Sequence, residues 1–532
     1  MRGEGPLDGV VPYPPDFAQR YRAKGYWRDR TMDQVFDELF DAHADRVALL
    51  HADEVITYAQ LAERRATIAA RLHDLGLRRR DRVVMHLPNA PEFLYLYFAL
   101  QMLGVIPVLA LAPHRRLEID HFARLTEAVA YFGTDEELGR TVQSSNPALR
   151  HVVLMDELRP GNAVASPPAV EVDPTDPCCL LLSGGTTGIP KLIPRTHNDY
   201  VYNSKAAAAV GYIDADSCQL SVAPLAHNMP LACPGVQGFL MHGARVVLSQ
   251  GTRATEVLPL VERQRVTHIA AVPALYIRWL SDADADAGDH DLTSVQLLQS
   301  GGQRLQPELR RRMAAFFPNA FVQENFGMSE GTLFFVSKEM SEEARMETVG
   351  IPVSADDEVR LCDESGTEVA DGEIGELTVR GPYTLRGYYR APEYNERQFT
   401  PDGFYRSGDL MRRHPSGAYL VEGRIKDLVN RGGEKISSEE VENLILMHPA
   451  VRNAACVPYP DRVLGERMCA CVILHPGQRL SLDELTTFLL GLGFAKFKLP
   501  ERLEVLDDFP LSPFGKVSKK ALADRLLTGD AV

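Results

Sequence analysis

The feature of this chain that most constrains its fold is a repeated alternation of short apolar runs with helical patterns. Residues 83–87 predict a buried strand, residues 91–103 predict a helix that ends before Gly104, and residues 105–109 predict the next strand. The same order recurs at residues 244–248, 257–264 and 268–272. Strand, helix and strand in succession are typical of layered α/β structure, so we expect a large α/β body built from such units.

Capping signals predict helix starts both in this body and in a smaller C-terminal part. A Ser or Thr followed three residues later by Gln or Glu predicts four helix starts, at Thr31–Gln34, Thr57–Gln60, Ser437–Glu440 and Ser481–Glu484. The third helix should run to Met447, before His448-Pro449. Residues 451–457 and 469–474 predict paired strands. We therefore expect a large N-terminal domain, 1–425, and a small α+β C-terminal domain, 426–532, joined by a polar hinge near Lys426.

The segment 183–191 reads Ser-Gly-Gly-Thr-Thr-Gly-Ile-Pro-Lys and follows the apolar run 178–182. Small residues after a strand allow backbone N–H groups to face an anion. The hydroxyls of Ser183, Thr186 and Thr187 and the charge of Lys191 suit a polyphosphate. A Walker loop is excluded because proline precedes the lysine and leucine follows it. A flexible surface turn is the alternative interpretation.

Four further motifs follow along the chain: Asn-Phe-Gly-Met-Ser-Glu at 325–330, Ser-Gly-Asp at 407–409, Gly-Arg-Ile-Lys-Asp at 423–427 and Gly-Lys at 515–516. In order and approximate spacing, the five motifs resemble those of the adenylate-forming superfamily. The resemblance covers nearly the whole chain and is closest to the stand-alone salicylate and 2,3-dihydroxybenzoate AMP ligases. It implies an enzyme that joins a carboxylate to ATP, releases pyrophosphate and then passes the acyl group to a thiol.

The resemblance also implies a nucleotide site. The loop residues Ser183, Gly184, Thr186, Thr187 and Lys191 would hold the β- and γ-phosphates of ATP, and Glu330 would bind Mg²⁺. Gly302 and Asn325 would flank adenine and ribose, while Asp409 would accept the ribose hydroxyls, with Arg424 following as in the family. Loop geometry is the alternative for Gly302 and Asn325, an Asx turn for Asp409, and a helix cap or surface acid for Glu330.

Lys516 is the residue that the resemblance assigns to adenylate formation. It would enter from the small domain and place a point charge between the carboxylate and the α-phosphate. Lys426 matches the position about which the two domains rotate. Rotation would withdraw Lys516 and bring the loop 431–435 to the tunnel for a pantetheine arm, although its glycines could instead form a plain turn.

Residues 224–235, which contain His227 and Asn228, are the part most similar to the aryl-acid enzymes. A neutral Asn228 can hydrogen-bond both a carboxylate and an ortho hydroxyl, because its amide donates and accepts. His227 would guide the carboxylate or merely pack, and Asn228 could instead cap its own turn. The resemblance also assigns Ser329 to the acid pocket.

Two positions favour salicylate over 2,3-dihydroxybenzoate. Cys233 stands where the dihydroxybenzoate enzymes tend to have serine, and Leu333 stands where they have the smaller valine. A buried 3-hydroxyl left without a partner costs about 1–3 kcal/mol, which is a preference of roughly tenfold or more. Both residues could also be ordinary core residues. Met229 replaces a common aromatic residue, and its flexible side chain predicts that methylated salicylates are accepted.

Composition limits the partners and the location. The formal net charge of −15 disfavours nucleic acid and anionic membranes as main partners. No long apolar run or signal-peptide core is present, so we expect a cytoplasmic enzyme, with eight cysteines as buried free thiols. The resemblance implies that the thiol acceptor is an aryl carrier protein of siderophore-type or nonribosomal peptide synthesis. The alternatives are a 2,3-dihydroxybenzoate AMP ligase, an aryl-CoA ligase or a catalytically silent nucleotide-binding protein.

Overall fold

The structure of the protein is a computed structural model, and it describes residues 5–159, 167–183, 190–286, 290–431, 434–512 and 516–528. The chain forms two compact units. The larger unit contains Met1–Arg345, Gly350–Glu358 and Val379–Tyr405. The smaller unit contains Met346–Val349, Val359–Thr378 and Arg406–Val532. The predicted boundary at 425/426 falls inside the smaller unit, and the hinge at Lys426 stays a prediction.

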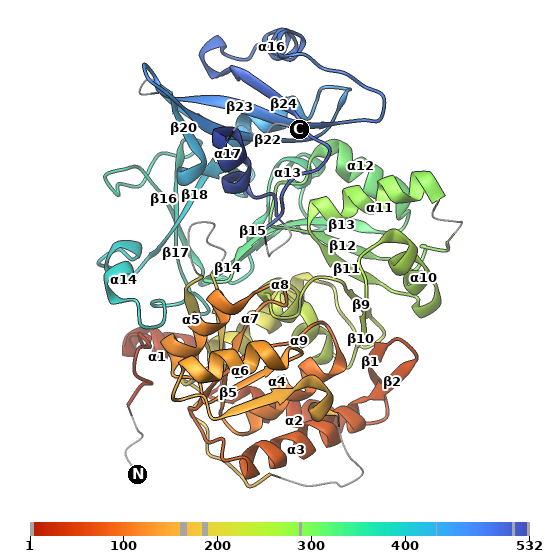
Figure 1. The fold of residues 1–532 in the computed structure, drawn as a ribbon, viewed down its shortest axis with the longest axis vertical. Helices are drawn as coiled ribbons and strands as arrows, with labels where there is room; N and C mark the ends of the chain where they lie inside the picture. Colours follow the sequence, from red (N-terminus) through yellow and green to blue (C-terminus); the bar gives the residue numbers. More distant parts are fainter. Residues whose placement is uncertain are drawn as a thin grey trace. The chain divides into compact units, whose positions relative to one another are not determined.

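A six-stranded sheet forms one layer of the larger unit (Figure 1). Its order is β6 (His151–Leu154), β5 (Ala130–Gly133), β3 (Arg82–His86), β4 (Ile106–Leu109), β7 (Pro177–Leu182) and β8 (Leu192–Thr196). All neighbouring strands are parallel except β7 and β8, which are antiparallel. The predicted strands at 83–87 and 105–109 are therefore adjacent in one parallel sheet.

A nine-stranded sheet forms the second layer of the larger unit. Its order is β15 (Ile351–Pro352), β14 (Gly331–Phe335), β13 (Phe321–Met328), β12 (Leu297–Ser300), β11 (His268–Ala271), β9 (Cys218–Ser221), β10 (Arg245–Leu248), β1 (Val47–His51) and β2 (Glu54–Thr57). The strands from β13 to β1 are parallel. The chain passes from β9 to β10 on one side and then to β11 on the other. Ligands of parallel sheets bind at the carboxyl ends of strands beside such a reversal.

Helices cover these sheets. Those of the larger unit are α1 (Pro15–Ala23), α2 (Met32–Ala42), α3 (Tyr58–Asp74), α4 (Pro91–Met102), α5 (Arg116–Thr126), α6 (Glu136–Ser145), α7 (His197–Val210), α8 (Asn228–Ala232), α9 (Gly235–Leu240), α10 (Ala254–Gln264), α11 (Pro273–Asp286), α12 (Pro307–Phe316) and α14 (Pro392–Gln398). A short helix, α13 (Glu342–Glu347), spans the division between the units, and η1 (Met155–Leu158) is a single 3₁₀ turn. Helix α7 packs on β7 and β8, α9 packs on β9 and β10, and the two helices contact each other.

The smaller unit holds two sheets. The bulk of a four-stranded sheet lies in it, in the order β16 (Glu358–Cys362), β17 (Ile374–Arg380), β18 (Tyr405–Arg413) and β19 (Tyr419–Arg424). The second sheet has the order β21 (Glu434–Ser437), β20 (Leu428–Arg431), β23 (Gly465–Leu474) and β22 (Val451–Asp461), with β24 (Arg502–Val505) parallel to β23. Its helical segments are η2 (Ile425–Asp427), α15 (Ser438–Ile445), α16 (Leu482–Gly491), η3 (Lys496–Lys498) and α17 (Lys519–Thr528).

The local predictions agree with these elements. Each predicted capping side chain accepts a hydrogen bond from the backbone N–H of the residue three positions later, as seen at Thr31, Thr57, Ser437 and Ser481. The helix expected to reach Met447 ends at Ile445, two residues earlier than predicted, and β22 pairs antiparallel with β23 as expected. All eight cysteines are buried and free, which confirms that prediction.

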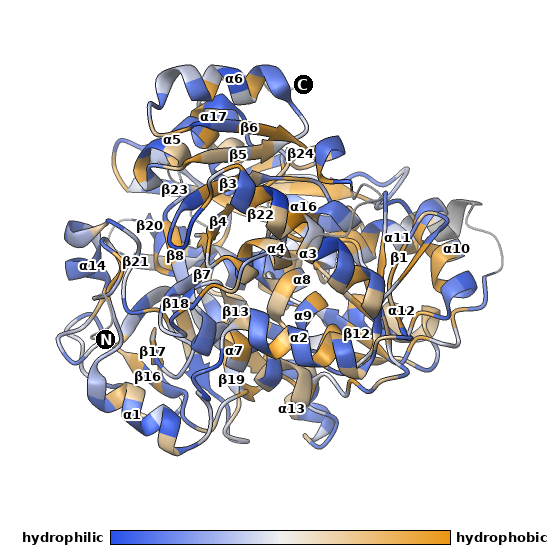
Figure 2. Cartoon of the chain, turned by 90° about the horizontal axis from the view of Figure 1, so that it is seen from below, coloured by the Kyte–Doolittle hydropathy of each residue, from blue (hydrophilic) through white to orange (hydrophobic). Residues whose placement is uncertain are grey.

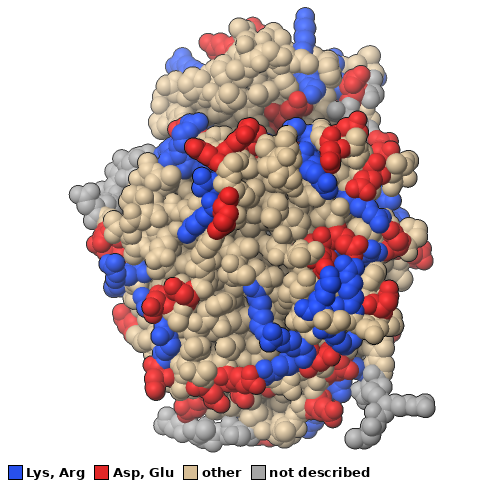
Figure 3. All heavy atoms as spheres, turned by 180° about the vertical axis from the view of Figure 1, so that it is seen from behind, with Lys and Arg blue, Asp and Glu red and all other residues tan. Residues whose placement is uncertain are grey.

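Hydropathy and charge follow the layers. In Figure 2 many strand residues are orange, whereas a helix such as α6 carries both blue and orange residues, as an amphipathic helix should. Figure 3 shows one face on which basic and acidic side chains are intermixed. Within the described parts of the chain, no helix is both long and apolar enough to span a membrane.

Candidate active site

The predicted phosphate loop joins two antiparallel strands. β7 ends at Leu182 and β8 begins at Leu192. The Ser183 N–H donates to the Lys191 carbonyl at 2.9 Å, and the Lys191 N–H donates to the Ser183 hydroxyl at 3.0 Å. These two bonds close the base of the loop. Gly184, Thr186 and Thr187 lie outside the described residues, so their phosphate contacts stay predictions.

The Lys191 side chain lies on an aromatic ring. Its Nζ is 3.9 Å from the centre of the Tyr394 ring, on α14. Burial lowers the pKa of Lys191, and the nearby Glu330 carboxylate opposes this effect. Cation–π contact holds an ammonium in place while leaving it charged. The structure thus brings two predicted site residues, Lys191 and Glu330, into one electrostatic environment.

Glu330 is buried at the turn between β13 and β14. Its Oε1 accepts a hydrogen bond from the Tyr388 hydroxyl at 2.7 Å, and Tyr388 also lies 2.9 Å from the hydroxyl of Tyr405. Burial and the Glu330 charge raise the pKa of Tyr388 far above its ordinary value, so this hydroxyl keeps its proton. A buried carboxylate whose orientation is fixed by a phenol is a suitable ligand for a hard cation.

The glycine after Glu330 fixes how this turn packs. Gly331 has φ of +131°, and a Cβ there would lie 2.4 Å from the Thr384 Cα. The Leu385 N–H donates to the Glu330 carbonyl at 2.7 Å. Glu330 is therefore held by the segment 383–388 through both backbone and side chain. Tyr388 and Tyr394 were not predicted as site residues, and in the sequence only the clustering of tyrosines between 383 and 405 marks them.

Two buried polar groups without partners among the described residues lie on adjacent strands, at the last residue of β12 and at the residue of β13 just beyond its pairing with β12. The Ser300 hydroxyl and the Asn325 Nδ2 are buried and lack hydrogen-bond partners among the described residues. Buried polar atoms normally have partners, so these two are candidate ligand contacts. Gly301 must be small here, because a Cβ would lie 1.9 Å from the Asn325 Oδ1. Gly302 adopts φ of +87°, and its predicted place beside the nucleotide fits this strand end.

Asn228 and His227 follow β9 at the reversal of strand order. Asn228 is buried at the first position of α8, and the Tyr200 hydroxyl donates to its Oδ1 at 3.0 Å. That bond engages the amide oxygen and leaves Nδ2 as the group that can donate to an acid. His227 precedes the helix, where its Nδ1 accepts the Met229 N–H at 3.4 Å. The structure thus gives His227 a capping role, while Met229 is half-buried.

Cys233 and Leu333 belong to one buried cluster, together with Ala207, Phe335 and Tyr383. Burial raises the pKa of the Cys233 thiol to about 11. The Asn203 Nδ2 lies 3.7 Å from the Cys233 sulfur and donates to the Ala232 carbonyl at 2.6 Å. Cys233 and Leu333, the two residues predicted to exclude a ring hydroxyl, therefore belong to the same buried cluster.

The carboxyl group of Asp357 is hydrogen-bonded to this cluster through Tyr383. The Tyr383 hydroxyl accepts the Leu333 N–H at 3.1 Å and donates to Asp357 Oδ2 at 2.6 Å. The other oxygen, Asp357 Oδ1, is buried without a partner among the described residues. Burial raises the pKa of Asp357 to about 8. A protonated Asp357 thus supports the strand that carries Leu333.

Arg195 links helix α8, which begins at Asn228, to the β13–β14 turn, which contains Glu330. It was not predicted from the sequence. Its side chain is fully buried, with Nε donating to Asp199 at 2.8 Å. Nη1 donates to the Ser329 carbonyl at 3.2 Å, and Nη2 donates to Asn203 at 3.3 Å. Since Asn203 holds the end of α8 and Ser329 precedes Glu330, one guanidinium fixes both segments. Ser329, predicted to line the acid pocket, is buried and contributes its carbonyl to this network.

In the smaller unit, the predicted ribose-binding residues are neighbours. Asp409 on β18 is opposite Arg424 on β19, and the Arg424 Nε donates to the buried Asp409 carboxylate at 2.6 Å. The Ser407 hydroxyl accepts the Asp409 N–H at 3.0 Å across Gly408, so the Ser-Gly-Asp segment also forms a turn. Lys426 follows in η2 and is exposed.

Lys516 follows residues 513–515, which lie outside the described residues. Leu511 and Val517 form an isolated antiparallel bridge. The Ser512 N–H donates to the Lys516 carbonyl at 2.7 Å, and the Ser518 N–H donates to the Pro510 carbonyl at 2.7 Å. The backbone of Lys516 is therefore held on both sides.

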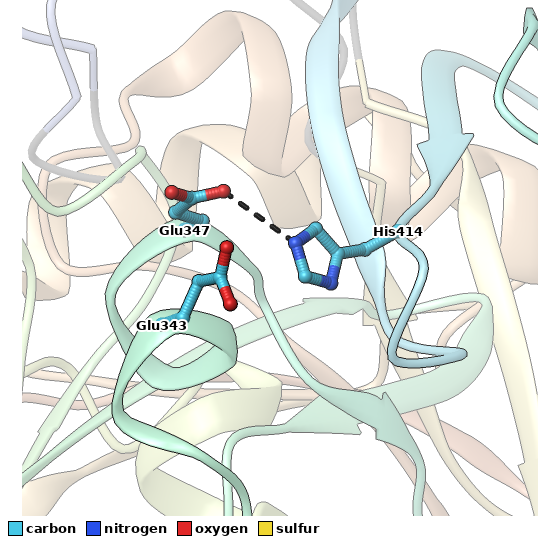
Figure 4. A group of neighbouring side chains, drawn as sticks. All are labelled: Glu343, Glu347 and His414. Atoms are coloured by element: carbon cyan, nitrogen blue, oxygen red, sulfur yellow. Dashed lines mark ion pairs between the residues drawn. The ribbon is translucent and has the colours of Figure 1, made fainter.

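A second group of acids and a histidine belongs to the surface. Figure 4 shows the Glu347 carboxylate paired with the His414 Nε2 at 3.5 Å, with Glu343 four residues earlier on α13. Both glutamates are exposed. Exposed groups of this kind are ordinary surface pairs, and we do not assign them a metal.

Comparison with known proteins identifies the family. Residues 36–389 match the AMP-binding enzyme family, and residues 440–516 match the AMP-binding enzyme C-terminal domain. The chain belongs to the AMP-binding enzymes. The adenylate-forming fold, with a large α/β part and a smaller C-terminal part, is thereby confirmed.

Three similar proteins place it more closely within the AMP-binding enzymes. A salicylyl-CoA synthase / salicylate adenylyltransferase of Streptomyces sp is 43% identical over 97% of both chains. A 2,3-dihydroxybenzoate-AMP ligase of Bacillus subtilis (strain 168) is 42% identical over 98% of this chain and 99% of its own. The apo structure of MbtA from Mycobacterium smegmatis is 40% identical, with a TM-score of 0.75 over 97% of this chain and 99% of its own.

Proposed function

We propose that this protein activates an aryl acid, with salicylate as its preferred substrate. The carboxylate would be joined to the α-phosphate of ATP with release of pyrophosphate. The acyl group would then pass to the phosphopantetheine thiol of an aryl carrier protein, in siderophore-type or nonribosomal peptide synthesis. The observation that carries the proposal is the buried Asn228 amide, oriented by Tyr200 in the segment that leads to Cys233. The salicylate and dihydroxybenzoate relatives support it.

Asn228 favours an acid without an amino group. Its Oδ1 is engaged by Tyr200, so Nδ2 can donate to a carboxylate or to the oxygen of an ortho hydroxyl. Residues 227–235 contain no acidic residue that could pair with an α-ammonium. Burying that ammonium without a counter-charge would be costly, and this cost would reject amino acids.

The chemistry has two steps. A carboxylate oxygen attacks the α-phosphorus, the bond from that phosphorus to pyrophosphate breaks, and an acyl-adenylate forms. The thiolate sulfur then attacks the acyl carbon and AMP leaves. Both steps concentrate negative charge, so fixed positive charges and oriented donors are the main aids. In the first step, adenylate formation, we assign this role to Lys191 and Lys516, and we assign to His227 the guidance of the carboxylate.

The proposed nucleotide contacts come from several of the sequence motifs. In this proposal Gly302, Asn325, Asp409 and Arg424 bind the adenosine, with Ser183, Gly184, Thr186 and Thr187 at the phosphates and Lys426 as the hinge. The unpartnered Asn325 Nδ2 and Ser300 hydroxyl are consistent with a polar ligand at this strand end. Glu330 fits Mg²⁺, because a single buried carboxylate together with phosphate oxygens is a normal site for this ion. Bound Mg²⁺ would neutralise charge on the phosphates.

A 2,3-dihydroxybenzoate AMP ligase is the second candidate, and the neighbouring Cys233 and Leu333 oppose it. Neither side chain offers a good partner for a 3-hydroxyl, and Leu333 occupies space. A cytoplasmic location is part of the proposal, since eight free thiols are typical of a reducing compartment.

Acid-dependent ATP–pyrophosphate exchange tests the function. We expect kcat/KM for salicylate to exceed that for 2,3-dihydroxybenzoate by about tenfold. Benzoate, which lacks the ortho hydroxyl, should also be weaker. Exchange driven by amino acids, or by no aryl acid, would contradict the proposal. Equal loading of coenzyme A and of a phosphopantetheinylated aryl carrier protein would instead favour an aryl-CoA ligase.

Substitution on another ring edge gives a separate test. Met229 is half-buried and flexible, so we propose that 6-methylsalicylate is accepted. Turnover with 6-methylsalicylate below about 1% of that with salicylate would refute this part of the proposal.

A further inference from the structure

A second lysine near Lys516 has a role that the proposed function does not assign. Lys519 is the first residue of α17, three positions after Lys516. Its Nζ lies 2.7 Å from Glu442 Oε1, and the two side chains are 26% and 14% exposed. Glu442 belongs to α15 and also accepts the Cys456 N–H at 2.6 Å. The ion pair therefore connects α17 to α15 and to β22.

The charge of Lys519 is favoured by two carboxylates. Although burial opposes the charged form, Glu442 and Asp427 together raise the pKa of Lys519. Asp427 is the last residue of η2, and its carbonyl accepts the Ser438 hydroxyl at 2.7 Å. Lys519 thus interacts with the segment that directly follows the predicted hinge residue, Lys426.

This anchor is transmitted to Lys516 over a short distance along the chain. Only Val517 and Ser518 separate the two lysines, and Ser518 is fixed by its bond to the Pro510 carbonyl. On the far side, Leu522 of α17 is buried in an apolar cluster with Phe509. The backbone on either side of Lys516 is therefore held by its own hydrogen bonds, and the start of α17 is held by Lys519.

We propose that Lys519 is a positioning residue, which sets the location of Lys516 for adenylate formation by pairing with Glu442. The proposal rests on the adenylation role proposed for Lys516. All these residues belong to the smaller unit, so the anchor would move with Lys516 if that unit rotates. Adenylation should then depend on Lys519, whereas transfer of a preformed acyl-adenylate should not.

The alternative is an ion pair that contributes only to stability. In that case its loss would lower the unfolding temperature and reduce both half-reactions together. A positioning role predicts a different result, because a displaced charge affects only the step in which that charge is used. Misplacement by about 1 Å can reduce a rate by about 10²-fold.

The full-length protein provides matched variants. Lys519→Met removes the charge, Lys519→Arg keeps it, and Lys520→Met changes the exposed neighbouring lysine. Lys519→Met/Glu442→Gln also removes the carboxylate that would be left unpaired, which protects the test against misfolding. Lys516→Ala is the reference. Salicylate-dependent pyrophosphate exchange, thioester formation from supplied salicyl-AMP and thermal unfolding are measured for each.

We expect Lys519→Met and the double variant to lose about 10- to 100-fold in kcat for adenylation, with KM for ATP and salicylate changed less than about threefold. Thioester formation should stay within about twofold, and Lys519→Arg should restore much of the adenylation. Equal adenylation by Lys519→Met and Lys520→Met would overturn the inference, as would parallel loss of both half-reactions in the double variant. Adenylation retained by Lys516→Ala would instead refute the proposed role of Lys516, and the inference with it.

Discussion

At the scale of single residues, the least expected finding is how the predicted metal ligand is held. Glu330 was identified from a motif, but Tyr388, which fixes its carboxylate, comes from a segment 58 residues later. A phenol hydrogen-bonded to a carboxylate leaves no local pattern in sequence, because the partners meet only in the folded protein. The same holds for Tyr200 and Asn228.

Tyr388→Phe tests this support. The variant removes one hydroxyl, so we expect the Mg²⁺ concentration that half-saturates pyrophosphate exchange to rise about tenfold, since partners of metal ligands tune affinity. Binding of Mn²⁺ with ATP, followed by electron paramagnetic resonance, should weaken in parallel. Tyr389→Phe, at the adjacent buried tyrosine, is the control. Unchanged metal dependence in Tyr388→Phe would show that this hydrogen bond does not tune the site.

The ring-specificity argument can be tested by changing both Cys233 and Leu333. Cys233→Ser/Leu333→Val adds a hydrogen-bonding hydroxyl and removes volume in one cluster. The ratio of kcat/KM for 2,3-dihydroxybenzoate to that for salicylate should rise about tenfold or more, since pairing a buried hydroxyl contributes about 1–3 kcal/mol. A ratio that does not move would mean that these residues are core residues away from the ring.

Asp357 predicts a pH dependence of stability. Its pKa is raised to about 8 in the folded protein from an ordinary value of 3.8, because of burial first, and the Asp356 charge adds to the rise. The folded state keeps a proton that the unfolded state releases, so this contribution to stability is complete below pH ~4 and is lost as the pH rises to about 8. The loss is about 1.4 kcal/mol for each pH unit.

Asp357→Asn keeps this side chain neutral at every pH. The advantage of the variant over the unchanged protein in unfolding temperature should therefore be smaller at pH 5 than at pH 9. Thermal unfolding followed by circular dichroism at both values measures it. A difference that is the same at pH 5 and pH 9 would mean that Asp357 is ionised in the folded protein throughout this range.

At the scale of elements, the sequence predicted the features that depend on residues close together in the chain. The capping boxes at Thr31, Thr57 and Ser481 are formed as expected, because a cap involves residues three apart. The chain from β13 through β14 to β15 was not predicted, because the tight turn between β13 and β14, Ser329-Glu330, lacks the Asn-Gly or Asp-Gly signal that predicts a hairpin. The candidate site lies at these strands, so its motifs could be recognised while its supporting contacts could not.

Gly331 shows how strictly the β13–β14 turn is built. In Gly331→Ala the new Cβ would meet the Thr384 backbone at 2.4 Å, and φ of +131° is strained for alanine. We expect this variant to lose most of its pyrophosphate exchange, because Glu330 must shift, and to unfold at a lower temperature. Gly372→Ala is the control, since that glycine also has positive φ but meets nothing within 4 Å. Equal effects of the two variants would mean that backbone strain alone explains the loss.

At the scale of the whole molecule, the chain forms two compact units. The larger unit contains Asn228, Asn325 and Glu330, and the smaller unit contains Asp409, Arg424 and Lys516. Two domains were expected from the shift in sequence pattern near residue 425. Grouping of the four-stranded sheet mainly with the C-terminal part was not expected, because the sequence of β16–β19 resembles that of any antiparallel sheet.

The proposed function requires that an aryl-adenylate binds where β9 and β12 end, beside Asn325 of β13. A crystal structure with a hydrolysis-resistant salicyl-adenylate tests it most directly. We expect the aryl ring to lie against Cys233 and Leu333, with Asn228 Nδ2 donating a hydrogen bond to the acid. The adenosine should lie beside Gly302 and Asn325. An aryl ring bound outside the Cys233–Leu333 cluster, with Asn228 still bonded only to Tyr200, would contradict it.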